Sequence, residues 1–510
     1  MKIEWSKIFA VLLALTLMLG LLSACGPGKD GDVNTQSMAP ADDEWRDAVP
    51  SSEPSGTPEP TLPDTYETAA PVSDKVLSDI AAGTVSAFGG GGNAMFERVA
   101  GTRDGGFAAT GFFSTAGGDF AGADKNWLEN KSMIVKYDQD GKLEWKAFLG
   151  GDGGGVDFRD LTQLADQSYI VAGRARSPSL GARSEKVFDA LLVKYSAAGK
   201  QEWVKIIGGA KDDFFSCVAA TPDGGFIAGG RVDSSDGDFE GLKADTIKAV
   251  LIKFDAEGGV RWKRAISGSK NNDFEGIAVN QDGSIFATCK TMSGDGDFTG
   301  IAGRGDADTL VFSYDKNGTF NWVRSFSGSG EDSLTAVAAS PDGGCVIAGK
   351  YGIQSTADGS FEPYHNAGAF DSFMVKYNKN GTIGWAKPFA GFNSEEITGI
   401  AAVNGGYAAA GISESNNRDF AAVGNKGARD GFLLLINELG ETVTVRPLAG
   451  TAEDVPRAAA SYDGSRVFVA GGTNSSDDFF AGLTPAVTKN LYNCFAAIFT
   501  AQYKDTAAAP

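Results

Sequence analysis

The sequence predicts an all-β protein, a seven-bladed β-propeller, on the basis of three observations. A short motif occurs seven times at intervals of about 60 residues. Each interval contains short apolar runs, and turns rich in Gly and Asp separate them. The seventh interval ends before its last apolar run, and a matching run precedes the first motif. We therefore expect an N-terminal strand to complete the last blade and to close the ring.

The motif is clearest in its third copy, residues 221–231, which reads Thr-Pro-Asp-Gly-Gly-Phe-Ile-Ala-Gly-Gly-Arg. Its Asp-Gly-Gly core is a tight turn between two apolar runs. The other six copies centre on residues 104–107, 166–169, 282–285, 342–345, 404–407 and 463–466. A fixed period of this size overrides the usual expectation of several domains for a chain of 510 residues, because a closed ring can be one domain.

The first 24 residues have the features of an export signal. Lys2 and Lys7 precede an apolar run, 8–22, that is too short to span a bilayer comfortably. The run ends in Leu-Ser-Ala-Cys, which resembles a bacterial lipobox. The resemblance implies cleavage before Cys25, acylation of Cys25 and attachment to the outer side of the cell membrane. The alternative is an ordinary secretory signal that happens to precede a cysteine.

The segment 25–78 is predicted to be a disordered tether. It is rich in Pro, Ser, Thr and acidic residues and cannot bury enough apolar surface to offset the entropy cost of ordering. The propeller is expected over 79–505, and 506–510 is a tail.

The third repeat shows the expected order of one blade. Apolar runs at 214–220, 226–231, 249–254 and 260–266 are strands a, b, c and d of an antiparallel meander. Tight turns join a to b and c to d, whereas longer loops join b to c and d to the next a. All long loops then lie on one face of the ring, the long-loop face, and the hairpins lie on the opposite, tight-turn face.

Strand d carries a tryptophan in five blades, and these side chains are expected to pack between neighbouring sheets. They are Trp145, Trp203, Trp262, Trp322 and Trp385. A stacking platform for sugars is the alternative. The sixth blade has Thr444 at this place, so that seam should be looser. The N-terminal strand is expected at 83–89, with Val85 at the tryptophan place.

Three motifs together resemble the β-propeller repeats of secreted bacterial lipoproteins. They are Asp-Gly-Gly-Phe at 104–107, Gly-Asp-Phe at 118–120, 237–239 and 296–298, and Lys-Tyr-Asp-x-Asp-Gly-x-x-x-Trp at 136–145. The resemblance covers about residues 83–503 and implies a fold and export. It implies no particular activity, because one fold can carry many functions.

Four basic residues follow strand b at equivalent positions of blades two to five: Arg174, Arg231, Lys290 and Lys350. Phe112, Ile412 and Thr473 interrupt the series in the other blades. A semicircle of cations at the channel mouth would bind an anionic sugar or phosphate group. Alternatively, each cation pairs with an acidic residue of its own b–c loop.

Aspartates recur at three places in the repeat, and oxygen ligands at loop tips suit calcium. Asp238, Asp295 and Asp297 are the candidate calcium ligands. The alternative is that these side chains accept hydrogen bonds from nearby backbone N–H groups and so stabilise turns. The sets lie in the b–c loops (Asp119, Asp238, Asp297, Asp419, Asp478), before strand a (Asp157, Asp213, Asp273, Asp332, Asp454) and at the start of strand c (Asp189, Asp308, Asp371, Asp430).

Few residues favour an enzyme. The single histidine, His365, has no nucleophile motif beside it, and no Cys/His cluster has zinc spacing. A carboxylate pair of a glycosidase needs no fixed spacing, so that alternative stays open. The tripeptide Arg-Gly-Asp at 304–306 matches an integrin-binding sequence but arises easily by chance. Cys217, Cys289, Cys345 and Cys494 fall in strands of four blades and are expected to be buried free thiols.

The net charge of −20 excludes a general nucleic-acid-binding surface. The sequence therefore predicts a lipid-anchored propeller that binds a glycan, another ligand or a surface protein on its long-loop face. A carbohydrate-active enzyme and a purely structural surface protein are the alternatives.

Overall fold

The computed structural model describes residues 45–47, 75–124, 131–151, 155–242, 246–301, 307–357, 359–364, 366–426, 429–483 and 491–505. Cys25, His365, the tripeptide at 304–306, the predicted signal and most of the predicted tether lie outside these residues. No helix in the described part of the chain is long and apolar enough to cross a membrane.

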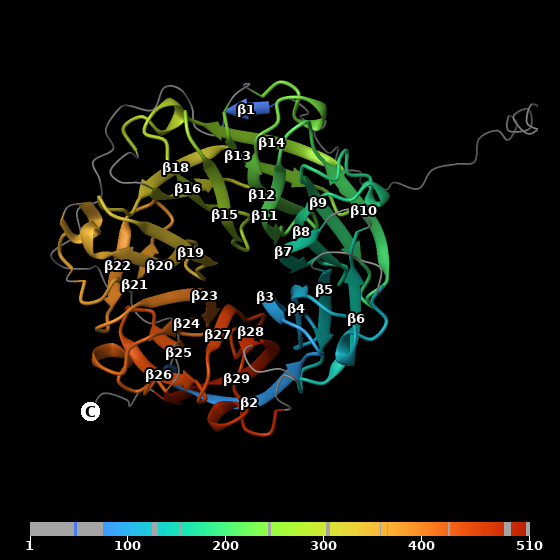
Figure 1. Ribbon diagram of the computed structural model, residues 1–510. Coiled ribbons are helices and arrows are strands. Elements are labelled where there is room, and N and C mark those ends of the chain that lie inside the picture. Colours follow the sequence, from blue (N-terminus) through green and yellow to red (C-terminus); the bar gives the residue numbers. More distant parts are fainter. Residues whose placement is uncertain are drawn as a thin grey trace, which may run out of the picture. The chain divides into compact units, whose positions relative to one another are not determined.

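The described chain from β2 onward is a seven-bladed β-propeller, as predicted (Figure 1). Each blade is a four-stranded antiparallel meander, with strand a beside the central axis and strand d at the periphery. The first three blades contain β3 (Ala94–Gly101), β4 (Phe107–Phe113), β5 (Lys131–Tyr137) and β6 (Leu143–Leu149); β7 (Val156–Gln163), β8 (Tyr169–Ala175), β9 (Asp189–Tyr195) and β10 (Gln201–Ile207); and β11 (Asp213–Ala220), β12 (Phe226–Val232), β13 (Lys248–Phe254) and β14 (Val260–Ser267).

The other four blades repeat this order. They contain β15 (Asn272–Val279), β16 (Ile285–Thr291), β17 (Asp308–Tyr314) and β18 (Phe320–Ser325); β19 (Asp332–Ala339), β20 (Cys345–Gly352), β21 (Phe370–Tyr377) and β22 (Ile383–Phe389); β23 (Glu395–Val403), β24 (Gly406–Ser413), β25 (Asp430–Asn437) and β26 (Thr442–Leu448); and β27 (Asp454–Ala460), β28 (Arg466–Thr473), β29 (Asn493–Asp505) and β2 (Lys75–Phe88).

Short 3-10 helices lie in the b–c loops and bring one buried aromatic ring under most of them. They are η1 (Gly118–Phe120), η2 (Pro178–Leu180), η3 (Gly237–Phe239), η4 (Gly296–Phe298), η5 (Ile353–Ala357), η6 (Gly359–Phe361), η7 (Arg418–Phe420) and η8 (Asp478–Phe480). Phe120, Phe239 and Phe298 of the Gly-Asp-Phe motifs are almost fully buried. The motif is therefore a structural element that fastens each long loop to its blade.

The N-terminal strand β2 pairs antiparallel with the C-terminal strand β29, which confirms the predicted closure. The register differs from the prediction by one residue. Val85 pairs with Ala497, and an irregularity between Ala82 and Val85 places Thr84 opposite Ile498, where the other blades have tryptophan. The extra residue of this bulge offsets the ladder, which the spacing alone did not reveal.

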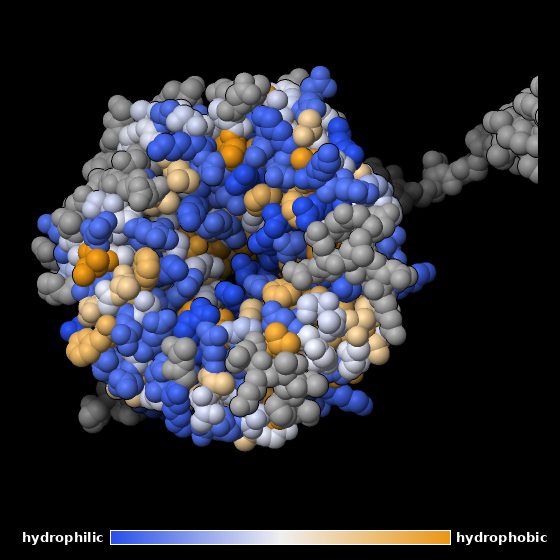
Figure 2. Space-filling view, viewed as in Figure 1, coloured by the Kyte–Doolittle hydropathy of each residue, from blue (hydrophilic) through white to orange (hydrophobic). Residues whose placement is uncertain are grey.

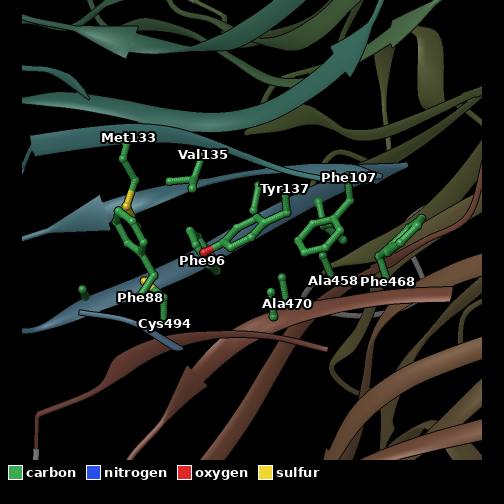
Figure 3. Close-up of a cluster of buried hydrophobic side chains, with 14 of the residues drawn as sticks. Phe88, Phe96, Phe107, Met133, Val135, Tyr137, Ala458, Phe468, Ala470 and Cys494 are labelled. Carbon is green, nitrogen blue, oxygen red and sulfur yellow. The ribbon is translucent and has the colours of Figure 1, made fainter. Parts of the chain in front are cut away.

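Apolar side chains from neighbouring sheets interdigitate to form the core. At the closing seam, Phe88 of β2 packs against Phe96 of β3, with ring centroids 6.1 Å apart, and Phe107 stacks on Phe468 of β28 at 5.0 Å (Figure 3). The two ends of the chain are thus joined by backbone pairing and by a buried cluster.

The strand-d tryptophans pack between neighbouring blades, as predicted. The Trp322 indole N–H donates to the Lys379 carbonyl at 2.9 Å, and the ring covers Gly381 in the c–d turn of the next blade. Trp145 and Trp385 make the same contacts. A tryptophan at Thr444 would lack this partner, because the seventh blade has the chain termini in place of a c–d turn.

One short segment of the predicted tether is structured. Residues Trp45–Asp47 form β1, which pairs in parallel with 263–265 of β14. An outermost strand has unpaired backbone groups that an extended segment can satisfy, so β1 makes the third sheet five-stranded. The expectation of a wholly disordered tether is wrong for these three residues.

Candidate binding cavity at the centre of the ring

Every inner strand carries a bulge at the same level of the ring. Its ladder with strand b skips one residue, so that one extra side chain points from each blade toward the axis. These seven residues, the bulge ring, are Glu97, Arg159, Ser216, Glu275, Thr335, Thr398 and Arg457. Bulges re-aim side chains and often lie beside functional sites.

The bulge ring lines a cavity of about 730 Å³, here called the mouth cavity. Residues at the ends of strands b and the starts of strands a and c complete its wall, so it lies toward the long-loop face. A second cavity of about 1100 Å³ continues toward the a–b hairpins. Arg98, Glu275, Thr335 and Thr398 line both cavities and form the waist between them. Figure 2 shows a hollow at the centre of the ring with many hydrophilic residues around it.

Three of the four basic residues predicted to bind an anionic ligand already form an ion pair with a carboxylate of the protein. Arg174 donates from Nε to Asp157 at 3.1 Å, and Lys350 donates to Glu396 at 3.3 Å. Arg231 contacts Asp233 through two nitrogens, at 3.0 and 3.2 Å.

The fourth cation, Lys290, lies directly across the ladder from Asp273. The seventh-blade residue at this level is Gly472, one position before the expected Thr473. Only Arg231 therefore pairs within its own b–c loop, as the alternative states. The partner of Arg174 lies on strand a of the same blade, and that of Lys350 lies on strand a of the next blade.

Two of these arginines also stack on aromatic rings that sequence reasoning missed. The Arg174 guanidinium lies 4.2 Å from the Phe188 ring centroid and 5.4 Å from that of Phe214. The Arg231 guanidinium lies 5.5 Å from the Phe214 ring centroid. Stacked and ion-paired guanidinium groups are held in place, so these arginines form a rigid wall of the cavity mouth.

Asp273 and Glu275, both on β15, are the least compensated of the carboxyl groups that line the mouth cavity. Among the described residues, the Asp273 carboxyl group accepts hydrogen bonds only from the Ser216 hydroxyl, at 3.2 and 3.4 Å. Burial and then the neighbouring Glu275 raise the pKa of Asp273 to about 8. Burial also raises the pKa of Glu275, against the fields of Lys290 and Arg98. Within the described residues neither carboxyl group is part of an ion pair.

The aspartates placed before strand a belong to two different sites. Asp213, Asp332 and Asp454 start their strands and accept backbone N–H groups of the preceding loop at 2.7–3.0 Å. Asp157 and Asp273 lie one position later and line the mouth cavity. The sequence prediction grouped all five, which is wrong, because successive residues of a strand point to opposite sides.

Carboxyl groups that start strand c meet those that start strand a of the next blade. The pairs with a mutual electrostatic effect are Asp308 with Asp332, Asp371 with Glu395, and Asp430 with Asp454. All six are almost fully buried. Burial raises the pKa of Asp332 and of Asp454 to about 6 and that of Asp371 to about 7. We call these pairs the seam carboxyls.

The b–c loop aspartates link neighbouring blades. Asp119, Asp238 and Asp297 each accept the backbone N–H of a residue at the end of the preceding blade, at 2.8–2.9 Å. Asp295 accepts the Ser269 N–H at 2.8 Å. The proposed calcium ligands Asp238, Asp295 and Asp297 are thus engaged by backbone donors. No group of three or more metal-ligating acidic, His or Cys side chains occurs among the described residues, and calcium binding stays a prediction.

The four cysteines of the propeller are buried and free, as predicted. Cys217 lies just after the bulge residue Ser216 of β11, and its thiol contacts the carbonyls of Gly229 and Phe274. Burial raises the pKa of the Cys217 thiol far above its ordinary value, so this group is not a reactive nucleophile.

No protein-family model matches the chain. Among curated proteins, it is similar to the regulatory protein FlaEY of Caulobacter vibrioides, with 24% identity over 354 residues. The match covers 63% of this chain and 35% of the relative, so this chain spans about a third of the relative's length.

Solved structures with a similar chain course include the Kuenenia stuttgartiensis hydrazine synthase, with a TM-score of 0.43, 13% identity and coverage of 84% of this chain and 99% of that one. YCF48 bound to a D1 peptide has a TM-score of 0.41, 9% identity and coverage of 85% and 100%. A puromycin hydrolase has a TM-score of 0.44, 11% identity and coverage of 75% and 50%. The propeller assignment rests on the strand pairing of this chain.

Proposed function

We propose that this propeller is a binding module whose ligand enters the mouth cavity from the long-loop face. One observation carries the proposal: seven equivalent bulges turn seven side chains, each charged or carrying a hydroxyl group, toward one cavity of about 730 Å³. This volume lies in the range of about 300–1,000 Å³ that is typical of small-ligand sites. The similarity to a protein named as regulatory also favours binding over catalysis.

The long loops then act as the rim of the site, and the stacked arginines Arg174 and Arg231 keep the rim rigid. A rigid site loses little conformational entropy when it binds a ligand. The lipobox-like sequence at Cys25 supports display of the propeller on the outer side of the membrane. There the rigid site captures a soluble glycan or part of a surface protein.

A carbohydrate-active enzyme is the second candidate, and one observation favours it. Asp273, with a pKa of about 8, would hold a proton at neutral pH, as the general acid of a glycosidase does. The enzyme requires turnover that is lost in Asp273→Asn, whereas the binding module requires saturable affinity without turnover.

The test is a thermal-shift screen of residues 75–510 against wall glycans and polysaccharides, with and without calcium. A ligand at 100 times its Kd stabilises the folded state by about 2.7 kcal/mol, which gives a measurable rise in Tm. A hit is then measured with Ser216→Trp, which fills the mouth cavity, and with Glu257→Trp, which adds the same side chain to an exposed c–d turn. Binding that survives Ser216→Trp in a folded variant contradicts the proposal.

A further inference from the structure

We propose that the mouth cavity recognises its ligand through a cationic group, a primary ammonium or a guanidinium, that lies between Asp273 and Glu275. This inference rests on the proposed function and identifies the chemistry of that site. The basic residues after strand b predicted an anionic ligand from sequence, whereas this inference assigns a cationic one.

The argument starts from which charges of the cavity are compensated. On the cationic side, Arg159 and Arg174 share Asp157, at 2.6 and 3.1 Å. Arg457 lies 3.9 Å from Glu97, and Lys350 lies 3.3 Å from Glu396. These groups already have an opposite charge and would have to exchange it for an anionic ligand.

The acidic side is different. Glu275 accepts no hydrogen bond among the described residues, and Asp273 accepts only those of the Ser216 hydroxyl. Both line the mouth cavity, and Glu275 also lines its waist. A carboxylate that has lost its water without gaining a charged partner is costly, and a ligand cation would remove that cost.

The surroundings leave these carboxyls available. The basic groups that influence Asp273 are Arg159 of β7 and Arg231 of β12, and those that influence Glu275 are Arg98 of β3 and Lys290 of β16. None of the four is within ion-pair distance of either carboxyl group in the described structure. On the other side, β19 contributes the uncharged Leu334 and Thr335 to the wall.

Long-range electrostatics point in the same direction. The chain carries a formal net charge of −20, which attracts cations toward the surface and repels anions. A cationic ligand is therefore favoured both on approach and at the site, whereas an anionic ligand would have to overcome repulsion on approach.

Binding of a cation beside Asp273 should release a proton, which can be measured. Asp273, with a pKa of about 8, is largely protonated at neutral pH while the cavity is empty. A cation beside it favours the ionised carboxylate, so binding releases a proton and affinity rises between pH 6 and pH 9.

Four probes test the proposal by isothermal titration calorimetry: tri-lysine, fully N-acetylated tri-lysine, the glucosamine trimer and the N-acetylglucosamine trimer. The acetylated member of each pair keeps the same number of units and replaces each ammonium group with a neutral amide. The two pairs distinguish a basic peptide from an amino sugar as the source of the ammonium group. Titrations in buffers of different ionisation enthalpy count the released protons.

We expect at least one ammonium probe to bind at pH 7, its acetylated partner to bind at least about tenfold more weakly, and proton release to accompany binding. Asp273→Asn and Glu275→Gln should each weaken binding by a similar factor. Glu257→Gln removes the same charge at the exposed c–d turn and should leave affinity unchanged. Asn and Gln replace carboxyl groups that are poorly compensated, so both variants should fold, as circular dichroism would verify.

The opposite results are distinguishable. No binding of either ammonium probe at millimolar concentration contradicts the inference, as does calcium binding at Asp273 and Glu275 that excludes both probes. An anionic probe such as inorganic phosphate that binds, and is lost in Lys290→Glu with Lys350→Glu, also overturns it. In that case Ser216→Trp decides whether the cavity itself is the site: loss of binding preserves the proposed function, and retained binding contradicts both.

Discussion

Arg446 on the outer strand of the sixth blade donates from one nitrogen to both carboxylate oxygens of Asp79, at 2.7 and 2.6 Å. Asp79 belongs to β2, so this contact joins the N-terminal strand to a blade that is 367 residues away in the sequence. It lies at the seam where Thr444 replaces tryptophan and where the c–d turn is absent. Both side chains are partly exposed, so the ion pair itself contributes little, about 0–1 kcal/mol.

Deletion of residues 79–90 should destabilise the entire ring. It removes most of the ladder between β2 and β29 and two almost fully buried side chains, Ile80 and Phe88. We expect a fall in Tm of many degrees or the loss of a cooperative transition in differential scanning calorimetry. Deletion of 26–40, which leaves β1 and β2 in place, is the control. An unchanged Tm after removal of 79–90 would show that the closure is not needed for stability.

Trp322→Ala should destabilise the protein by about 3–5 kcal/mol, the usual range for truncation of a large core residue. The Trp322 ring is 6% exposed and covers the next blade's turn at Gly381. Thr444→Ala at the equivalent position of the sixth blade is the matched control and should have a small effect. The measurement is the shift in Tm, and equal shifts for the two variants would contradict the packing role of the tryptophans.

Folding stability should fall as the pH rises from about 5 to 8. Asp332 and Asp454 have pKa values of about 6 and Asp371 of about 7 when folded, whereas an unfolded aspartate has a pKa of about 3.9. Between these values the folded protein binds more protons than the unfolded chain, so stability decreases with rising pH. The chain has one histidine, and histidine titration therefore contributes little.

At lower pH the trend should reverse, because carboxylates such as Asp282, with a pKa of about 2 owing to Lys379, favour the folded state only while ionised. The measurement is Tm against pH, with a maximum expected at about pH 4, where the unfolded aspartates titrate. Asp371→Asn should raise Tm at pH 8 and flatten the curve. A Tm that rises steadily from pH 5 to pH 8 would rule out protonated seam carboxyls.

Cys25 should carry the membrane anchor. We expect wild-type protein expressed in a bacterial host to incorporate radiolabelled palmitate and to sediment with membranes, because two or more acyl chains hold a protein firmly. Cys25→Ala should lose the label and appear in the soluble fraction. Cys217→Ala, which removes a buried thiol, should keep the label. Label retained in Cys25→Ala would contradict the lipobox interpretation.

Much of the fold follows from local patterns. The Gly-rich turns and the apolar runs predict all seven blades, and a strand-d tryptophan marks five of them. The third blade's strands agree with the prediction within one residue at each end. Less of the candidate site could be predicted from the sequence. The basic residues after strand b were found. The carboxylate partners of Arg174 and Lys350, on strand a of the same and of the next blade, were not, because register and ring order set those partners.

The bulge ring shows why the rest of the candidate site could be recognised only in the structure. A bulge leaves no clear sequence signature, yet it decides that Glu275 and its six equivalents point to the axis. One signal was present: the residues three positions after the start of each strand a are charged or carry hydroxyl groups in all seven repeats. That signal becomes meaningful only once the strand starts are aligned by register.

The sequence by itself determined the seven repeats, their order of strands and the closure of the ring, because turn residues and apolar periodicity act over a few neighbours. The tertiary structure decided which charges meet. Asp213 and Asp273 look equivalent along the chain, yet one accepts backbone N–H groups at a seam and the other lines the cavity. A shift of one residue moves a strand side chain to the opposite side, so only the register separates a structural carboxyl from a ligand-binding one.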